Sequence, residues 1–592
     1  MLIKLTILPD NRQLYVEKGS NLLNVLQSNG YNINSPCGGM GICGKCGIRI
    51  GTLSSERGFI FEEDNGEKSH LACRVSIEDD TIIELPPSIN NVPLKETIKS
   101  NFLTQLSPGL KKFFFSLPLA SSHDQRSYSQ RIQDSFGEKL SFSLEVLRKI
   151  PLIVRDNDFK ATITVDERDG VIDLEGGDKR GEFYGIGIDI GTTTVVIYCF
   201  NLITGKEIAA KSITNPQTIY GADVISRIHY VNRNGNSGLK ELQEKILTGL
   251  NSLLDKICCN INISRKNIYK ATIAGNPTMI HLLLAIDPSY IGRSPYISVL
   301  RDIISLKSKE LGLNIHPEGT VYILPGVSAY VGGDITGGIL ATGIDKSKTL
   351  KLLIDIGTNG EIVLGYKNKI LACSTAAGPA FEGTNIEKGM RAQEGAIYKI
   401  EPNKGDIILK TFGDGTPSGI CGSGLIDFVA SLRKLNLISE NGRLIKDSSI
   451  PGGLRISTIR EREVSFNLYD DIYVSQKDIR EVQLAKGAIR AGIEILLKEF
   501  GVTTKDIKEV YLAGAFGSFL RKESVKAIGL IPPVKLSKIK SVGNSAGAGV
   551  KLCLLNQSEL KHIQKIAERV DYLELSYRAD FNDEFIKQMK FS

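Results

Sequence analysis

One pentapeptide occurs twice in this chain. Ile-Asp-Ile-Gly-Thr occupies residues 188–192 and returns 166 positions later, at 354–358. Each copy ends an apolar strand, and a second predicted strand follows it, over 195–200 in one case and 361–365 in the other. A strand–turn–strand unit that recurs at such a distance indicates an internal duplication.

A second pair of segments supports the duplication. A helical pattern at 241–243 precedes the apolar segment 267–276, and a matching pattern at 481–483 precedes the segment 506–515. The offset from helix pattern to strand is 26 positions in the first copy and 25 in the second. Two similar α/β halves in one chain predict a cleft between them, where ligands commonly bind. We therefore expect one duplicated α/β domain over 184–592.

The two pentapeptides form glycine turns that suit a nucleotide phosphate. In each, an Asp ends a strand, a Gly makes a tight turn, and Thr hydroxyls and backbone N–H groups point into the cleft. Asp189 and Asp355 would face each other there and hold Mg²⁺, directly or through water, or orient the attacking water. The expected phosphate contacts are Gly191, Thr192, Thr193, Gly357, Thr358 and Asn359.

A later turn suits the nucleoside. The strand 510–513 runs into the sequence Gly-Ala-Phe-Gly at 514–517, where small residues let an adenosine lie against the backbone. The alternative is that these glycines serve only helix packing. The expected contacts are Gly514, Ala515 and Gly517.

Two predicted helix starts also bear on the cleft. The glycine turn 418–424 leads into the apolar segment 425–432, and a helix N-terminus of this kind suits phosphate. Asp334 stands at another predicted helix start. For Asp334, a position facing the cleft and a helix-capping role are both open.

Four of the ten cysteines lie within the first 73 residues, as C-x5-C-x2-C with one more 27 positions further on. Four thiolates are a ligand set for a [2Fe–2S] cluster, although the plant-type spacing, C-x4-C-x2-C, is one residue shorter. Glycines between the cysteines let the backbone wrap an inorganic core closely. The alternative, a zinc site, favours two close cysteine pairs, and the last cysteine here is single. The expected ligands are Cys37, Cys43, Cys46 and Cys73.

The segments around the cysteine loop alternate between strand and helix patterns. Ser20 is the expected N-cap of the helix. This order of elements resembles the β-grasp ferredoxin fold, so we expect a ferredoxin-type domain over 1–87. The predicted elements are strands over 2–8, 13–17 and 81–85 and a helix over 20–28.

Between the two domains the chain is less informative. Residues 88–112 form a polar, proline-studded stretch that we expect to be a linker. Residues 113–183 predict a small α+β domain, with a helix at 144–150 and strands at 161–165 and 170–174.

Composition excludes several classes of protein. Of the 592 residues, 42% are hydrophobic and 23% charged, which excludes wholesale disorder. No apolar run approaches the ~18 residues that span a bilayer, and the first residues do not resemble a secretory signal, so we expect a cytoplasmic protein without a membrane partner. The net charge of +7 comes without interleaved basic and aromatic residues, so no nucleic-acid binding is expected.

The segment 184–592 resembles the acetate-kinase, sugar-kinase, heat-shock-chaperone and actin superfamily of ATPases, whose paired hairpins bind phosphate and metal. The turn at 514–517 departs from the Gly-Gly-like turn of that superfamily. Joined to a ferredoxin-type N-terminus, the whole chain resembles the reductive activators of corrinoid proteins. Besides the cysteine loop and the paired pentapeptides, the segments 274–279 and 373–383 carry this resemblance.

The resemblance implies an α/β multidomain architecture whose C-terminal domain is a duplicated ribonuclease-H-like ATPase. It implies a [2Fe–2S] cluster, ATP and Mg²⁺ as cofactors, and ATP-dependent reduction of Co(II) to Co(I) in a corrinoid partner. An upstream low-potential electron donor and a homodimer are also implied. In the loop after the second hairpin, Glu382 would position water, or be a solvated or capping carboxylate. Ser374 would touch the corrinoid metal site of a docked partner, or be a structural turn hydroxyl.

Two other functions fit parts of the sequence. An ATP-dependent electron donor to another metalloprotein would use the same domains. A small-molecule kinase with an accessory ferredoxin domain would need an aspartate base beside a hydroxyl-substrate pocket, and no distinctive signature of one is found.

Overall fold

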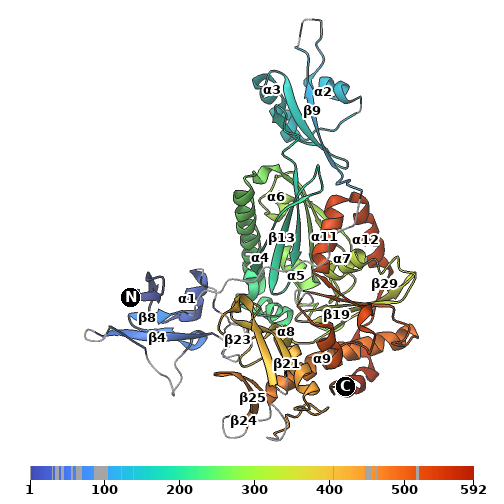
Figure 1. Cartoon of the computed structure of the whole chain (residues 1–592). Coiled ribbons are helices and arrows are strands. Elements are labelled where there is room, and N and C mark those ends of the chain that lie inside the picture. The colour runs from blue at the N-terminus through green and yellow to red at the C-terminus, as the bar shows by residue number, and fades with distance from the viewer. Residues whose placement is uncertain are drawn as a thin grey trace.

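A computed structural model of the chain describes residues 2–29, 31, 33, 39, 41, 46–54, 58–61, 70–85, 105–119, 121, 123–137, 139–403, 406–446, 455–459, 463–514 and 519–591. Figure 1 shows the chain as an N-terminal ferredoxin-like unit, a small unit of three strands and two helices, and a large α/β unit. Across these described residues, no helix is both long and apolar enough to cross a membrane.

The N-terminal unit is a mixed sheet with the strand order β2-β1-β8-β4-β5. Strand β1 pairs antiparallel with β2 and parallel with β8, as in a β-grasp fold. Alternate residues of β1, namely Ile3, Leu5 and Ile7, are buried in its core. The elements are β1 Leu2–Leu8, β2 Arg12–Glu17, helix α1 Leu22–Ser28, β4 Gly47–Ser54, β5 Gly58–Phe61 and β8 Thr81–Glu84.

The N-cap of α1 is not the one predicted. Asn21, rather than Ser20, accepts a hydrogen bond from the backbone N–H of Asn24 through its side chain. Ser20 belongs to the short strand β3 (Ser20–Asn21), where it pairs with Ile77. Because strand pairing keeps Ser20 extended, the helix begins one residue later than the local pattern indicated.

The small unit is a three-stranded antiparallel sheet, β11-β10-β9, with two helices packed on it. Strand β9 starts at Leu110, inside the segment predicted to be a linker, because its pairing with β10 extends to the Leu110–Asp166 pair. The elements are β9 Leu110–Ser116, α2 Tyr128–Phe136, α3 Leu144–Asp156, β10 Lys160–Asp166 and β11 Gly170–Gly176.

The large unit contains two sheets that share five strands of the same topology and differ in where the sixth strand pairs, so the predicted duplication is confirmed. In each half, three antiparallel strands are followed by a long helix, and two parallel strands then continue the sheet beside the first strand. The first half has β12 Tyr184–Ile190, β13 Thr194–Asn201, β14 Glu207–Thr214, α4 Val224–Ile261, β15 Ile268–Gly275, β16 Ile304–Lys307 and β17 Thr320–Ile323. The second has β18 Lys351–Ile356, β19 Gly360–Tyr366, β20 Lys369–Thr375, α9 Gln476–Phe500, β27 Glu509–Ala513, β28 Ile539–Gly543 and β29 Val570–Tyr572.

The two halves meet through the helices that follow their last parallel strands. These are α7 (Gly333–Thr342) in the first half and α11 (Ser545–Leu555) in the second. Gly337 and Gly549 lie at the crossing, where a methyl group on Gly549 would come within 2.4 Å of the Gly337 Cα. Any larger residue there would force the two helices, and with them the two halves, apart.

The halves differ in what joins the third strand to the long helix. The first half uses residues 215–223, with one short turn, η2 (Pro216–Tyr220). The second half inserts residues 376–475, whose described parts include two three-stranded sheets and helix α8. The insertion contains η4 Pro379–Glu382, β21 Ala396–Asn403, β22 Asp406–Thr411, β23 Gly419–Ile420, α8 Gly422–Lys434, β24 Ile456–Ile459, β25 Glu463–Tyr469 and β26 Ile472–Ser475.

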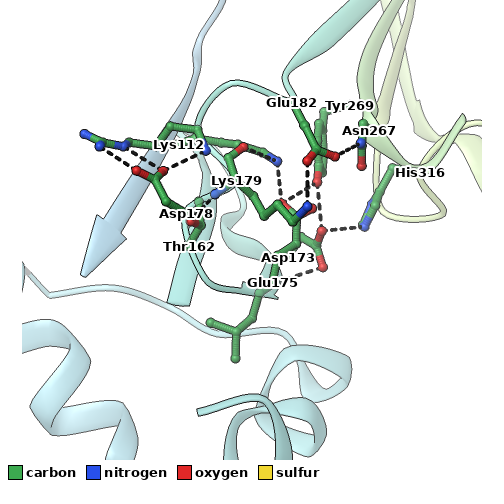
Figure 2. Close-up of polar contacts among 12 residues, drawn as sticks. Lys112, Thr162, Asp173, Glu175, Asp178, Lys179, Glu182, Asn267, Tyr269 and His316 are labelled. Atoms are coloured by element: carbon green, nitrogen blue, oxygen red, sulfur yellow. Dashed lines mark hydrogen bonds and ion pairs between the residues drawn. The ribbon is translucent and has the colours of Figure 1, made fainter. Parts of the chain in front are cut away.

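A buried polar network fixes the small unit to the first half (Figure 2). The Tyr269 hydroxyl donates to Asp173 at 2.9 Å and to Glu175 at 3.1 Å, and the His316 ring nitrogen lies 3.2 Å from Asp173. The buried ammonium of Lys112 pairs with Glu175. Burial works against ionisation of Asp173, but the bonds from His316 and Tyr269 lower its pKa to about 2. The small unit is therefore an anchored part of the first half.

Candidate functional site

A cavity of about 230 Å³ lies between the two halves of the large unit. Both pentapeptide turns reach it, and so does the insertion of the second half. A cleft between duplicated halves was expected, and the cavity brings together residues that are far apart in sequence. The predicted residues that line it are Asp189, Gly191, Thr192, Thr193, Asp355, Gly357, Thr358, Asn359, Glu382 and Gly514.

Buried polar side chains hold the first hairpin from behind. The Asn215 amide donates to the carbonyl of Gly191 at 2.8 Å, and the Asn276 amide donates to the hydroxyl of Thr192 at 3.0 Å. The guanidinium of Arg227 donates to the carbonyl of Thr192 at 2.5 Å. Arg227 is fully buried, and this burial lowers its pKa to about 9. The hairpin is thus rigidly placed, with a cation directly behind it.

The second hairpin depends on a close approach of the backbone. Gly514, at the end of β27, has φ +92°, and a Cβ there would lie 2.7 Å from the Asp355 carboxylate. Only glycine fits this position. The predicted adenosine contacts Ala515 and Gly517 lie outside the described residues, whereas Phe519 lines the cavity and packs edge-on against Phe412, with ring centroids 5.3 Å apart.

Four carboxylates gather at the bottom of the cavity. Burial raises the pKa of Asp189 to about 6, although the Asn544 amide donates to it at 2.6 Å. Burial and then mutual repulsion raise the pKa of Asp355 to about 7, and that of Asp334, where backbone hydrogen bonds oppose the shift, to about 7. Burial and then repulsion by Asp334 and Asp355 also raise the pKa of Glu361. A cation bound here would stabilise the ionised forms of these acids, so the group marks a candidate cation site.

This group of acids fits a hydrated divalent ion better than a closed metal cage. Among the residues that the structure describes, no three side chains of the metal-binding types converge closely enough to hold an ion unaided. Mg²⁺ keeps several waters and commonly completes its shell with substrate phosphates. The carboxylates and the hairpins beside them offer such an arrangement.

Glu382 connects the two hairpins. One of its carboxylate oxygens accepts a hydrogen bond from Thr193 at 2.6 Å, and the other accepts one from Thr358 at 2.5 Å. Its side chain is buried. A single acid from the insertion therefore engages the hydroxyls expected to meet phosphate in both halves.

Two other predicted residues have different surroundings. Ser374 lies in β20, where its hydroxyl donates to Glu361 at 3.3 Å, and it is not among the cavity-lining residues. Asp334 lies in the first turn of α7, after the N-cap Gly332, and lines the cavity. Its carboxylate also accepts a hydrogen bond from the backbone N–H of Ile335 at 2.8 Å, so its position fits both the role facing the cleft and the one at the helix start.

Several cavity residues were not predicted. Glu361 had a signal, because it aligns with Val195 in the duplication and so places a charge within an otherwise apolar strand pattern. Asn276 lies in a segment already noted for its family resemblance. Arg391, in the irregular part of the insertion, had no local signal. The unpredicted residues discussed here are Asn276, Glu361, Arg391, Phe519 and Asn544.

In the N-terminal unit, two of the four predicted cluster ligands are described. The Sγ atoms of Cys46 and Cys73 lie 3.3 Å apart. The backbone N–H of Ala72 donates to the carbonyl of Cys46, and the Asn21 amide donates to that of Cys73, both at 2.9 Å. Two thiols held this close fit ligands of one iron. The other two predicted ligands, Cys37 and Cys43, lie outside the described residues.

The fold and the cleft define a duplicated, actin-like ATPase joined to a ferredoxin-type domain. Family comparisons agree with this class along the chain. Residues 5–78 match a 2Fe-2S iron-sulfur cluster binding domain, 103–181 the RACo linker region, 184–347 the RACo middle region, and 349–592 the C-terminal domain of RACo, the ASKHA domain. The predicted fold class is confirmed.

Comparisons with individual proteins identify the family. The corrinoid activation enzyme RamQ of Eubacterium limosum is 32% identical, over 98% of this chain and 97% of its own. The [Co(II) methylated amine-specific corrinoid protein] reductase of Methanosarcina barkeri is 26% identical over 69% of this chain and 77% of its own. A solved structure, the reductive activator for corrinoid, iron-sulfur protein, is 34% identical, covers 100% of this chain and 98% of its own, and has a TM-score of 0.76. The chain belongs to the family of reductive activators of corrinoid proteins.

Proposed function

We propose that this protein activates a corrinoid protein reductively at the expense of ATP, passing one electron from a [2Fe–2S] cluster to Co(II) to regenerate Co(I) for methyl transfer. One observation carries the proposal. A chain similar over nearly its whole length to corrinoid activators combines an iron–sulfur domain with an ATPase cleft lined by both predicted hairpins.

In the iron–sulfur domain, the cluster would be held by Cys37, Cys43, Cys46 and Cys73. When bound, such a cluster supplies a one-electron carrier of low potential. The spacing of the Cys46 and Cys73 thiols supports this ligand set. The role of the chain is to hold the thiols at fixed separation and to leave the carrier able to meet a partner.

In the ATPase domain, the hairpin residues Gly191, Thr192, Thr193, Gly357, Thr358 and Asn359 would bind the nucleotide phosphates. Asp189 and Asp355 would hold Mg²⁺ through water or orient the attacking water, with Glu382 positioning that water between the two Thr hydroxyls. Adenosine would lie against Gly514, Ala515 and Gly517.

ATP is needed because reducing Co(II) to Co(I) requires a very low potential. Nucleotide binding can drive such a step only through different affinities for two conformations of the protein. Two halves joined by the α7–α11 helix pair, with the hairpins at their meeting point, provide a hinge for closure around the nucleotide. The proposal also includes an upstream low-potential electron donor, a cytoplasmic location and a homodimer formed through the ATPase domain, as the family resemblance implies.

The test is made under strict anaerobiosis. Chemically reduced protein is mixed with a Co(II) corrinoid protein, with and without Mg-ATP, while the Co(I) absorbance band is followed. Co(I) should appear only with ATP. A Cys46→Ser variant should lose the reaction, whereas Cys259→Ser, which alters an exposed thiol elsewhere, should keep it.

Two results would reject the proposal. If no corrinoid protein is reduced despite an intact cluster and measurable ATP hydrolysis, the acceptor is another metalloprotein. If ATP is consumed only when a sugar or acyl acid is added, the protein is a kinase with an accessory ferredoxin domain.

A further inference from the structure

The cavity has one acidic side and one mixed side. Four of its acids project from the two central sheets and from the start of α7, and a fifth, Glu382, comes from the insertion. The insertion contributes Ala392, Cys421 and Ser423, the last two at the N-terminus of helix α8, together with Arg391. Within the described lining of the cavity, Arg391 is the one lysine or arginine side chain. A helix N-terminus and a guanidinium both favour an anion on that side.

Arg391 lacks a fixed partner within the described part of the chain. No hydrogen bond or ion pair joins its side chain to the residues that the structure describes. Burial lowers the pKa of Arg391, and the negative charge of Glu382 opposes that shift. The positive charge of Arg391 in turn helps to lower the pKa of Arg227, the residue that holds the carbonyl of Thr192. The Arg391 side chain lines the same cavity as Glu382 and the first hairpin.

The backbone around Arg391 is well anchored, in contrast to its side chain. The N–H of Met390 donates to the carbonyl of Ile420, and the N–H of Ile420 donates to the carbonyl of Lys388, both at 2.9 Å. Ile420 ends β23, and Cys421, the N-cap of α8, follows directly. Arg391 and the start of α8 are thus tied together and would move as one body with the insertion.

We propose that Arg391 is the side chain that binds the terminal phosphate of ATP, reaching across from the insertion to the place where the two hairpins meet. This assignment rests on the proposed nucleotide-dependent function. Arginine presents a planar fork of donors that matches phosphate oxygens in pairs. ADP lacks the terminal phosphate, so Arg391 would contact ATP and not ADP. The contact would add a tie between the insertion and the hairpins, beside the bonds of Glu382, only in the ATP state, which is the differential affinity that coupling requires.

The test compares two nucleotides on the full-length protein. Binding of a non-hydrolysable ATP analogue and of ADP, each with Mg²⁺, is measured calorimetrically for the wild type, Arg391→Ala and Arg391→Lys. Arg391→Ala should lower the affinity for the ATP analogue by about 10- to 100-fold, the effect expected when a hydrogen bond to a charged group is lost. Affinity for ADP should change by less than about threefold. The affinity of Arg391→Lys for the ATP analogue should lie between those of the wild type and Arg391→Ala, because lysine keeps the charge but loses the paired donor geometry.

Lys388→Ala is the matched control, since Lys388 lies in the same loop and pairs with Asp471 at 2.6 Å, away from the lining of the cavity. It should bind both nucleotides as the wild type does. Melting temperature and the visible spectrum confirm that each variant is folded.

Equal losses for both nucleotides in Arg391→Ala, or no loss for either, would overturn the assignment and leave the proposed function standing. A wild-type protein that binds neither nucleotide would overturn the proposed function, and the assignment with it.

Discussion

The two halves of the cleft share their backbone plan and differ in what faces the aspartate near the end of the first strand. Asp189, one residue before the end of β12, meets Asn544, the N-cap of helix α11, which donates to it at 2.6 Å. Asp355, one residue before the end of β18, has two charged neighbours, Asp334 in the first turn of helix α7 and Asp189 itself. Each aspartate is thus met from the helix of the opposite half, by an amide in one case and by a carboxylate in the other.

This difference shows where the duplicated site became asymmetric. The amide satisfies Asp189 without added charge, whereas Asp355 lies among the negative charges of Asp334 and Asp189. The side of the cleft around Asp355 therefore has the greater need of a cation. The insertion adds to the asymmetry, because Glu382 and Arg391 have no counterpart in the short connection of the first half.

The largest effect should come from removing either aspartate. Asp355→Ala and Asp189→Ala should each lower ATP hydrolysis by at least about 100-fold, the scale of lost electrostatic stabilisation, while leaving the visible spectrum of the cluster unchanged. If the asymmetry matters, the loss should be greater for Asp355→Ala. Steady-state hydrolysis measures this, with Asp471→Ala, an acid 76% exposed in the insertion, as the control. Turnover that survives both changes would show that the metal assignment is wrong.

Glu382→Gln should give the next largest effect. Glutamine can still accept a hydrogen bond from one threonine, but it has no charge with which to position or polarise a water. We expect kcat to fall by about 100-fold, with binding of an ATP analogue little changed. Hydrolysis at the wild-type rate would instead mean that Glu382 only ties Thr193 and Thr358 together.

The carboxylate cluster predicts a dependence on pH. The folded-state pKa values, about 6 for Asp189 and about 7 for Asp334 and Asp355, lie above the ordinary 3.8. Their contribution to stability without a bound cation is therefore complete below pH 3.8 and is lost as pH rises through 6 and 7. Because Mg²⁺ must displace these protons, its apparent affinity should improve by about tenfold per pH unit for each proton displaced, and level off above pH 7.

Two measurements check this. One is the Mg²⁺ requirement of ATP hydrolysis across that pH range, and the other is the melting temperature of the nucleotide-free protein. A Mg²⁺ requirement that does not change with pH would contradict the picture of protonated, cation-seeking acids.

Asp334→Asn makes the second side of the cleft resemble the first. Removing one of several buried like charges should raise the melting temperature of the nucleotide-free protein above pH 7, where Asp334 is ionised. The same change should lower the apparent affinity for Mg²⁺ in the hydrolysis assay by about tenfold, as expected for a group that supports a metal site. The reverse exchange, Asn544→Asp, should lower the melting temperature. Identical behaviour of the two variants would argue against the asymmetry.

Features repeated along the chain were predictable, because each copy of the pentapeptide carries its own strand pattern and turn. The partners of those residues were not, since the Asn544–Asp189 contact joins positions 355 residues apart. Glu361 could have been found by aligning it with Val195. Arg391 could not, because the insertion has no second copy to compare and its loop follows no periodic pattern. At Ser20, strand pairing with Ile77 overrode a local capping preference.

The smallest effect should come from Ser374→Ala. Ser374 was predicted to touch the cobalt site of a docked partner, yet its hydroxyl donates to Glu361 at 3.3 Å from within strand β20. A neutral hydroxyl at that distance contributes on the order of 0.5 kcal/mol, so ATP hydrolysis should change by no more than about twofold. Co(I) formation should fall in the same proportion if Ser374 acts only through Glu361. A loss confined to Co(I) formation, with hydrolysis intact, would support the predicted contact between Ser374 and the partner. It would place the docking surface on the second half of the cleft.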